Sequence, residues 1–206
     1  MPRIASARPG AEPSSPRQHA RRQSILRVAS DMAADTGLEG VQMQEVARCA
    51  GVAIGTLYRY FPSKTHLFTA AMAEQIEEFG AARPPAPAAP DRPEDAVLDA
   101  LVRATRNLLR RPALATAMIQ SSNAARAGTV PDLARVDTGF ADLLARAWGA
   151  DPPTEDQSAR LRLLILLWYG VLQSRLNENI TPDQADENLR MACSLLLAAP
   201  RPTGFR

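Results

Sequence analysis

Five prolines between residues 82 and 93 divide this 206-residue chain into two parts. Proline fixes φ and has no backbone N–H, so this segment cannot lie inside a helix or a sheet and is expected to be a linker. On both sides of it, apolar residues recur at helical spacing, and 37 alanines favour helix over strand. No segment shows strand alternation. The sequence therefore predicts an all-α fold of about nine helices.

Glycine, proline and capping residues set the expected ends of these helices. Gly37 stops the first helix, Pro62 ends the third, and Ser63, Thr154 and Thr181 can cap the helices that follow them. The expected helices span residues 18–37, 42–50, 53–60, 64–79, 94–110, 113–127, 132–148, 155–178 and 182–199.

The composition excludes several classes of protein. The longest apolar stretch, residues 163–172, is too short to span a bilayer, and the first residues lack the apolar core of a secretory signal. Cys49 and Cys193 give neither a disulfide framework nor a zinc ligand set. His19 and His66 stand beside no cysteine or carboxylate cluster, and no catalytic motif occurs. We therefore expect a soluble cytoplasmic protein without enzymatic activity, cofactor or metal.

The positive charge is concentrated near the N-terminus. Residues 1–27 hold six arginines and one glutamate, so they carry six minus one, or +5, while the whole chain carries +2. Residues 1–17 can be interpreted as a disordered basic arm held near a polyanion, or as a solvated tail that reflects genomic base composition. Lys64 is the only lysine in the chain.

Two short helices joined at residues 50–52 form a helix-turn-helix pattern. Ala47 is small enough for the helices to approach, and Gly51 supplies the turn conformation without steric cost. Lys64 begins the next helix, where an ammonium and backbone N–H groups can share a phosphate. The second helix carries polar and aromatic side chains suited to phosphates and base edges, namely Thr56, Tyr58, Arg59 and Tyr60. The alternative is a plain helical hairpin whose tyrosines pack inward.

Residues 41–68, VQMQEVARCAGVAIGTLYRYFPSKTHLF, closely resemble the DNA-binding signature of the tetracycline-repressor (TetR) family. The resemblance covers roughly residues 20–70. It implies a homodimer of all-helical subunits. A three-helix DNA-binding domain would occupy residues 18–64, a ligand-binding and dimerisation domain residues 65–200, and a tail residues 201–206.

The resemblance also implies which side chains meet a DNA operator. Gln44, Thr56, Tyr58 and Tyr60 would contact it, and Lys64 would hold a phosphate. The chain departs from the signature at three positions, since Gln42 and Ala53 replace hydroxyl caps and Ile54 replaces a common lysine. Arginines of the arm can offset that loss by reaching phosphates or the minor groove. The predicted DNA contacts are Arg17, Arg21, Arg22, Gln42, Gln44, Thr56, Tyr58, Arg59, Tyr60 and Lys64.

Two further segments, RRPALATAM at residues 110–118 and PTEDQ at 153–157, are similar to actinobacterial repressors of steroid degradation. Those repressors respond to bulky steroid-derived CoA thioesters, so the resemblance implies a hydrophobic effector. Large or polar side chains after the proline-rich segment are the candidates to line its site. The predicted ligand contacts are Met118, Gln120, Asn123, Phe140, Leu144, Trp148, Trp168, Tyr169 and Gln173.

The helix expected at residues 155–178 contains LRLLILLWYGVLQ, which is apolar on nearly every side. Such a helix must be covered on all faces. With the helix at residues 182–199, it resembles the intersubunit four-helix bundle of the same family, while the alternative is a simple buried core.

The sequence therefore predicts a repressor that binds a pseudo-palindromic operator as a homodimer and is released by a hydrophobic effector, with a steroid- or fatty-acid-derived CoA thioester as the candidate. Two alternatives stay open. One is a helical dimerising DNA-binding protein without an effector. The other is a helical protein–protein module whose helix-turn-helix has lost DNA binding.

Overall fold

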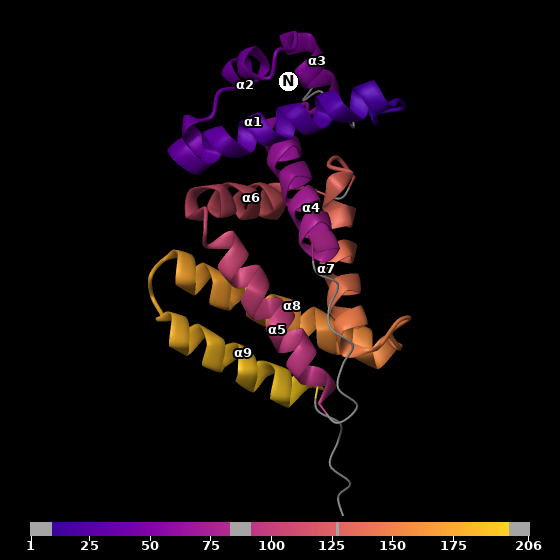
Figure 1. Ribbon diagram of the computed structural model, residues 1–206, viewed down its shortest axis with the longest axis vertical. Coiled ribbons are helices and arrows are strands. Elements are labelled where there is room, and N and C mark those ends of the chain that lie inside the picture. The colour runs from indigo at the N-terminus through magenta and orange to yellow at the C-terminus, as the bar shows by residue number, and fades with distance from the viewer. Residues whose placement is uncertain (1–9, 83–91, 127, 198–206) are drawn as a thin grey trace, which may run out of the picture. The chain divides into compact units, whose positions relative to one another are not determined.

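The computed structural model describes residues 10–82, 92–126 and 128–197, in which nine helices and no strand are present (Figure 1). This confirms the predicted all-α class. The proline-rich linker, the outer part of the arm and the C-terminal tail lie largely outside the described residues. The helices are α1 (Pro16–Gly40), α2 (Met43–Cys49), α3 (Ile54–Tyr60), α4 (Lys64–Ala82), α5 (Pro93–Leu108), α6 (Pro112–Ala124), α7 (Asp132–Trp148), α8 (Glu155–Leu176) and α9 (Pro182–Leu197).

The helix ends follow the predicted capping residues. The Thr154 hydroxyl accepts from the backbone N–H of Gln157, whose side chain accepts from the N–H of Thr154 in return. This reciprocal pair satisfies two donors that the first turn of α8 leaves free. Gly37 has φ 68° inside the last part of α1, so the regular helix is interrupted where the sequence predicted its end. Only glycine adopts this left-handed conformation without steric cost.

The described contacts divide the chain into two units. Unit 1 comprises Met1–Phe79 and Leu108–Gly139, and unit 2 comprises Gly80–Asn107 and Phe140–Arg206. The sequence-based boundary near residue 65 differs from this division, because α6 and the first half of α7 fall in unit 1. The physical reason is that α6 packs against α1.

The core of unit 1 is built from small and apolar residues of α1, α4 and α6. Ile25, Ala29 and Ala33 of α1 are fully buried, as are Leu67 and Phe68 of α4. Alanines at four-residue spacing on α1 allow a neighbouring helix to approach closely. α1 packs against both α6 and α2, and α2 packs in turn against α3.

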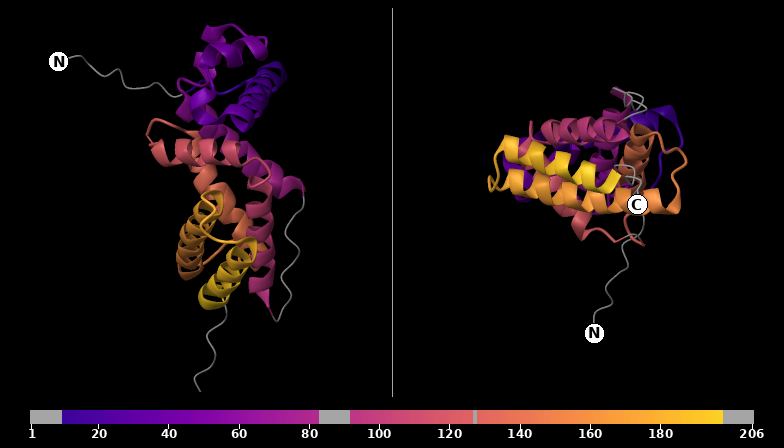
Figure 2. Two further views of the ribbon diagram at one scale, coloured as in Figure 1. Left: turned by 90° about the vertical axis from the view of Figure 1, so that its left-hand side faces the viewer. Right: turned by 90° about the horizontal axis from the view of Figure 1, so that it is seen from below.

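In unit 2, α8 and α9 lie side by side and antiparallel, as Figures 1 and 2 both show. Trp168 of α8 is buried against Phe140, with ring centroids 4.6 Å apart, and its indole N–H donates to the Thr105 hydroxyl at 2.8 Å. Thr105 in turn donates to the carbonyl of Leu101. The buried polar atoms of this group thus have partners within unit 2.

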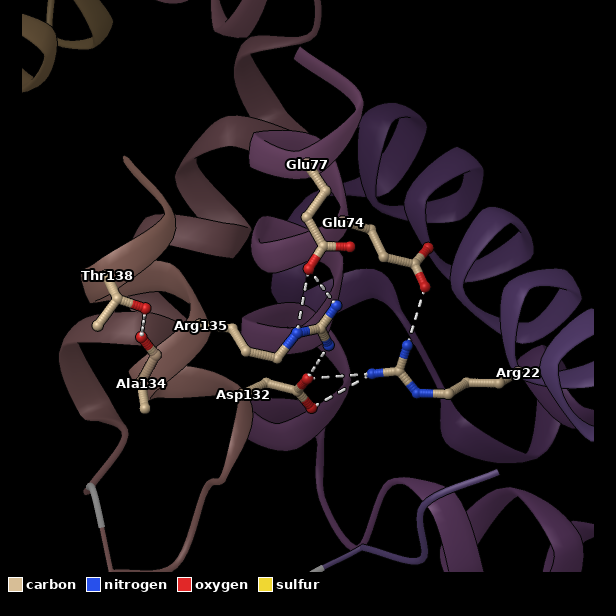
Figure 3. Close-up of polar contacts among 7 residues, drawn as sticks. All are labelled: Arg22, Glu74, Glu77, Asp132, Ala134, Arg135 and Thr138. Carbon is tan, nitrogen blue, oxygen red and sulfur yellow. Dashed lines mark hydrogen bonds and ion pairs between the residues drawn. The ribbon is translucent and has the colours of Figure 1, made fainter. Parts of the chain in front are cut away.

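Five charged side chains of unit 1 form a cluster that joins α1, α4 and α7 (Figure 3). Arg22 of α1 donates to Glu74 at 2.8 Å and to Asp132 at 3.2 Å. Arg135 donates to Asp132 and to Glu77, both at 2.5 Å. We call these five residues the Arg22 cluster. Glu74 and Asp132 lie 52 and 110 residues from Arg22 along the chain, so the cluster connects helices that are far apart in sequence.

The centre of the Arg22 cluster is mostly shielded from solvent. The side chains of Arg22, Glu74 and Asp132 are 13%, 22% and 20% exposed. Burial raises the pKa of Glu74 above its ordinary value, although the nearby Arg22 acts in the opposite direction. A buried carboxylate needs its cation, because an unpaired buried charge is costly. Arg22 therefore offsets part of the negative charge of Glu74 and Asp132, and this charge would destabilise unit 1 more strongly without it.

We predict that Arg22→Ala lowers the free energy of unfolding by about 1–3 kcal/mol, because Glu74 and Asp132 lose their shared cation. Urea titration followed by circular dichroism measures this loss. Arg17→Ala is the matched control, since Arg17 is exposed on the same helix and should change stability by less than about 0.5 kcal/mol. In a Glu74→Gln background the loss should be smaller. A stable Arg22→Ala variant would contradict this account of the cluster.

Candidate DNA-binding surface

α2 and α3 form a helix-turn-helix whose turn is tightly hydrogen-bonded. Gly51 has φ 66°, and the N–H of Val52 donates to the carbonyl of Ala47 at 3.0 Å. Val46 and Ala47 of α2 and Leu57 of α3 are buried beneath the turn. These three residues form a small core, while Val52 is half-buried.

The opposite sides of both helices face outward. Gln42 and Gln44 are exposed at the start of α2, and Tyr58 and Arg59 are exposed on α3, with 46% of Tyr58 accessible. Thr56 is half-buried. These side chains offer hydrogen-bond donors and acceptors, one cation and an aromatic face on one short helix and its neighbour. Such a set can contact phosphates and the edges of bases.

Tyr60 differs from its predicted role as an operator contact. It is only 5% exposed, its ring lies 6.3 Å from that of Phe61, and its hydroxyl is buried without a hydrogen-bond partner in the described structure. Leu57 and Tyr60 share the inner face of α3, because residues three apart lie on one side of a helix. The inward-packing alternative therefore holds for Tyr60, while Tyr58 points to solvent.

Neither short helix has a side-chain cap at its N-terminus. Gln42 precedes α2 and Ala53 precedes α3, and neither makes a capping hydrogen bond. This agrees with the missing hydroxyls noted in the sequence. Lys64, predicted to hold a phosphate, donates to the carbonyl of Leu38 at 3.1 Å. An ammonium has three donors, so this bond leaves two for other partners.

The three arginines predicted to contact DNA from the arm and the start of α1 have different surroundings. Arg17 is exposed on the first turn of α1, and Arg21 is half-buried one turn later. Arg22 belongs to the Arg22 cluster, and its guanidinium also lies 5.4 Å from the centre of the Phe61 ring. Its charge is thus neutralised within unit 1, which the sequence did not indicate.

Residues 10–15, which we call the strap, directly precede α1 in the chain and contact the carboxyl end of α3. The N–H of Ala11 donates to the carbonyl of Arg59 at 2.8 Å, and Gly10 lies against the backbone of Tyr60. Ser15 then caps α1 through the N–H of Gln18. The sequence predicted a disordered arm over residues 1–17, but residues 10–17 are held by these contacts and by the start of α1. The spacing of residues in the sequence did not indicate the contact between the strap and α3.

A polar cleft of about 480 Å³ lies in unit 1 beside the strap. Its lining includes Gly10, Pro13, His19 and Tyr60 together with members of the Arg22 cluster. None of the nine predicted ligand contacts lines this cleft. The cleft is polar and charged, whereas the predicted effector is hydrophobic.

The predicted ligand contacts are divided between the two units. Met118 is buried in unit 1, and the three polar candidates, Gln120, Asn123 and Gln173, are exposed. The remaining residues belong to unit 2, where Phe140, Leu144 and Trp168 are buried and Trp148 and Tyr169 are half-buried. The ring of Trp168 contacts the rings of both Phe140 and Tyr169. The structure thus brings together three of the four predicted aromatic contacts, while the predicted amides are exposed.

Two other properties bear on function. Within the described residues, no group of histidine, cysteine, aspartate and glutamate side chains has the arrangement of a metal site. In the same part of the chain, no helix is both long and apolar enough to cross a membrane.

Sequence profiles match most of the chain. The family described as "Bacterial regulatory proteins, tetR family" matches residues 25–71, and "Tetracyclin repressor-like, C-terminal domain" matches residues 91–196. The HTH-type transcriptional repressor KstR of Rhodococcus jostii is 35% identical over 184 residues, which cover 89% of this chain and 86% of that protein. KstR of Mycobacterium tuberculosis is 32% identical over 180 residues, covering 87% and 82%.

Solved structures agree with the sequence comparison. The crystal structure of a TetR transcriptional regulator from Rhodococcus sp. RHA1 is 50% identical, with a TM-score of 0.83 over 88% of this chain and 97% of that one. The multidrug binding protein EbrR in complex with ethidium is 22% identical, with a TM-score of 0.62 over 87% and 99% of the two chains, which shows a shared fold. The chain therefore belongs to the TetR family of bacterial transcriptional regulators and is similar along most of its length to its KstR repressors.

Proposed function

We propose that α3 is the recognition helix of a repressor that binds a pseudo-palindromic operator as a homodimer in the bacterial cytoplasm. The observation that carries this proposal is the exposure of Tyr58 and Arg59 on a helix whose other face, with Leu57, is buried. A helix held this way can enter the major groove without unfolding its own support. The similarity to KstR repressors supports the same activity.

The proposed DNA contacts follow from which side chains face outward. Gln44, Thr56, Tyr58 and Arg59 would meet bases or nearby phosphates, and Gln42, Lys64, Arg17 and Arg21 would meet phosphates. Tyr60 and Arg22 are left out of the set. Tyr60 is buried, and the Arg22 guanidinium is held by Glu74 and Asp132.

We predict that Tyr58→Ala weakens binding to the operator by roughly tenfold or more, because each half-site loses a contact of about 1–3 kcal/mol. The measurement is fluorescence polarisation with labelled DNA from upstream of the protein's own gene, at several salt concentrations. Unfolding by urea should be nearly unchanged, since Tyr58 is 46% exposed.

The control substitution is Asn123→Ala, at an exposed position on α6 outside α2 and α3. It should bind the operator as the parent does. If the parent itself bound DNA with no salt dependence and no preference for the operator, the repressor proposal would be wrong and the protein–protein module would replace it.

The dimer is proposed to form through α8 and α9. Leu163, Leu166 and Leu167 of α8 and Met191 and Leu195 of α9 are exposed in the single chain, with Leu166 at 69% and Leu195 at 75%. Large apolar patches on a soluble protein usually mark an interface. The two helices lie side by side, so a second copy can cover both with the same pair and form a four-helix bundle.

We predict that Leu166→Glu combined with Leu195→Glu converts the protein to a monomer, because four buried carboxylates would face one another across the interface. Light scattering after size-exclusion chromatography gives the mass. The monomer should also bind the operator at least about tenfold more weakly, since two linked half-sites bind more tightly than one. Thr138→Glu, an exposed position on α7, is the control and should leave the dimer intact. A dimeric double variant would contradict this interface.

The effector is proposed to be a hydrophobic molecule that binds the aromatic group of unit 2, a steroid- or fatty-acid-derived CoA thioester being the candidate. The contacts of the Trp168 ring with Phe140 and with Tyr169 support this assignment, because fused apolar rings or acyl chains pack well on aromatic faces. Such an effector would release DNA only through its different affinities for the DNA-bound and free states.

We predict that a steroid-CoA or long-chain acyl-CoA thioester changes the fluorescence of Trp168 and raises the melting temperature. The chain has two tryptophans, so Trp148→Phe isolates the signal of Trp168. Binding should also release labelled operator at the same ligand concentration. Free CoA, which lacks the apolar part, is the control and should do neither. If none of these thioesters had any effect, the dimerising DNA-binding protein without an effector would be favoured.

A further inference from the structure

We infer that the strap, residues 10–15, is a positioning element that fixes the carboxyl end of the recognition helix α3 for operator binding. The strap contributes backbone groups to this end of α3, in addition to whatever contacts its neighbouring arginines make with DNA. This inference rests on the proposed function, in which α3 reads the operator.

The need for such an element follows from the shortness of α3. It has seven residues, and an isolated helix of this length is unstable in water. Its N-terminus has no side-chain cap, because Ala53 has no hydroxyl. At its other end, the carbonyls of the last turn have no partners within the helix itself. α3 therefore depends on groups from outside for its position.

The strap supplies one of those groups. The N–H of Ala11 donates to the carbonyl of Arg59 at 2.8 Å, and the N–H of Phe61 donates to the carbonyl of Leu57 at 2.8 Å. The last turn of α3 thus receives one hydrogen bond from its own continuation and one from the strap. Arg59 is the residue next to Tyr58, so the strap acts directly behind the side chains proposed to contact DNA.

Gly10 allows the strap to come this close. A Cβ at this position would lie 2.0 Å from the carbonyl oxygen of Tyr60, which is a backbone atom and cannot swing away. Any larger residue must therefore displace the strap or the end of α3. Gly10 is required here by close approach of two backbones.

The other end of the strap is fixed to α1. The Ser15 hydroxyl accepts from the N–H of Gln18, and the N–H of Ser14 donates to the Gln18 side chain at 2.7 Å. Only Glu12 and Pro13 separate this capped start from Ala11, and Pro13 is stiff. The strap consequently links the first turn of α1 to the last turn of α3 over a short distance along the chain, and it transmits the orientation of one to the other.

The test compares variants that differ only in the strap contact. Ala11→Pro removes the N–H donor, and Ala11→Gly at the same position keeps it. Gly10→Val forces the strap away from Tyr60. All are made in the full chain and titrated against labelled operator and against unrelated DNA of the same length, with Tyr58→Ala in parallel.

We expect Ala11→Pro and Gly10→Val to bind the operator roughly tenfold more weakly, because each of two half-sites loses a hydrogen bond that orders α3. Binding to unrelated DNA and the dependence of affinity on salt should stay unchanged, since no phosphate contact is removed. Ala11→Gly should bind within about threefold of the parent. Hydrogen exchange should become faster for the amides of α3 and stay the same for those of α8, a readout that separates local positioning from loss of the fold.

The outcomes distinguish the strap from the proposed function. If Tyr58→Ala weakens binding and the two strap variants do not, the strap inference is wrong and the recognition helix stands. If affinity for operator and for unrelated DNA fell equally, the strap would act through charge or fold and its positioning role would be refuted. If Tyr58→Ala had no effect, α3 would not be the recognition helix, and the proposed function would fail with it.

Discussion

The ion pairs of Arg22 hold together parts of unit 1 that the chain order keeps far apart. From α1, this single side chain contacts Glu74 of α4, Asp132 of α7 and the ring of Phe61, the residue directly after α3. Because its charge is paired and its side chain is largely shielded, the contact has a fixed geometry. The position of α3 relative to α1 is therefore set by a charged residue as well as by apolar packing.

α3 shows why these outside contacts matter. Its inner face consists of Leu57 and Tyr60, while Tyr58 and Arg59 face solvent. One buried leucine and one buried tyrosine give a seven-residue helix little intrinsic stability. The turn at Gly51 holds its beginning, and Phe61 and the strap hold its end. The outward side chains of α3 are then free to contact DNA, because none of them is needed to keep the helix in place.

The helices and their ends could be predicted because they depend on local patterns. Helical spacing, Gly37, Pro62 and Thr154 each act within a few residues, and the structure agrees with them. The inward position of Tyr60 was also available from spacing, since it lies three residues after the buried Leu57. The residue types of the second helix and the family signature had both assigned Tyr60 to DNA instead.

The partners of Arg22 could not be predicted in the same way. From the sequence, an arginine near the N-terminus can be interpreted as a DNA contact or as one half of an ion pair. The acidic partners of Arg22, Glu74 and Asp132, lie 52 and 110 residues away along the chain. The contact of Ala11 with Arg59 involves two backbone groups, which carry no sequence signal. Met118 and Trp168 are both large and apolar on helices, yet they belong to different units, and residue type alone does not indicate this division. What the sequence lacked in each instance was the long-range pairing, which only packing determines.

The distribution of charge gives the second copy of the proposed dimer a role in DNA binding. The surface of α2 and α3 has few cations, because Ile54 stands where the family often has lysine and Arg48 is paired with Glu45. Each neutralised phosphate contributes to affinity, so a single copy has a weak electrostatic contribution. Unit 2 instead carries a set of exposed leucines on α8 and α9, and the exposure of this apolar surface to water is unfavourable in free energy. In the proposed dimer, burying those leucines against a second copy would join two weak DNA-binding surfaces, and their binding free energies would then add on one operator. In this proposal, the apolar face of unit 2 would thus compensate for the sparse positive charge of α2 and α3.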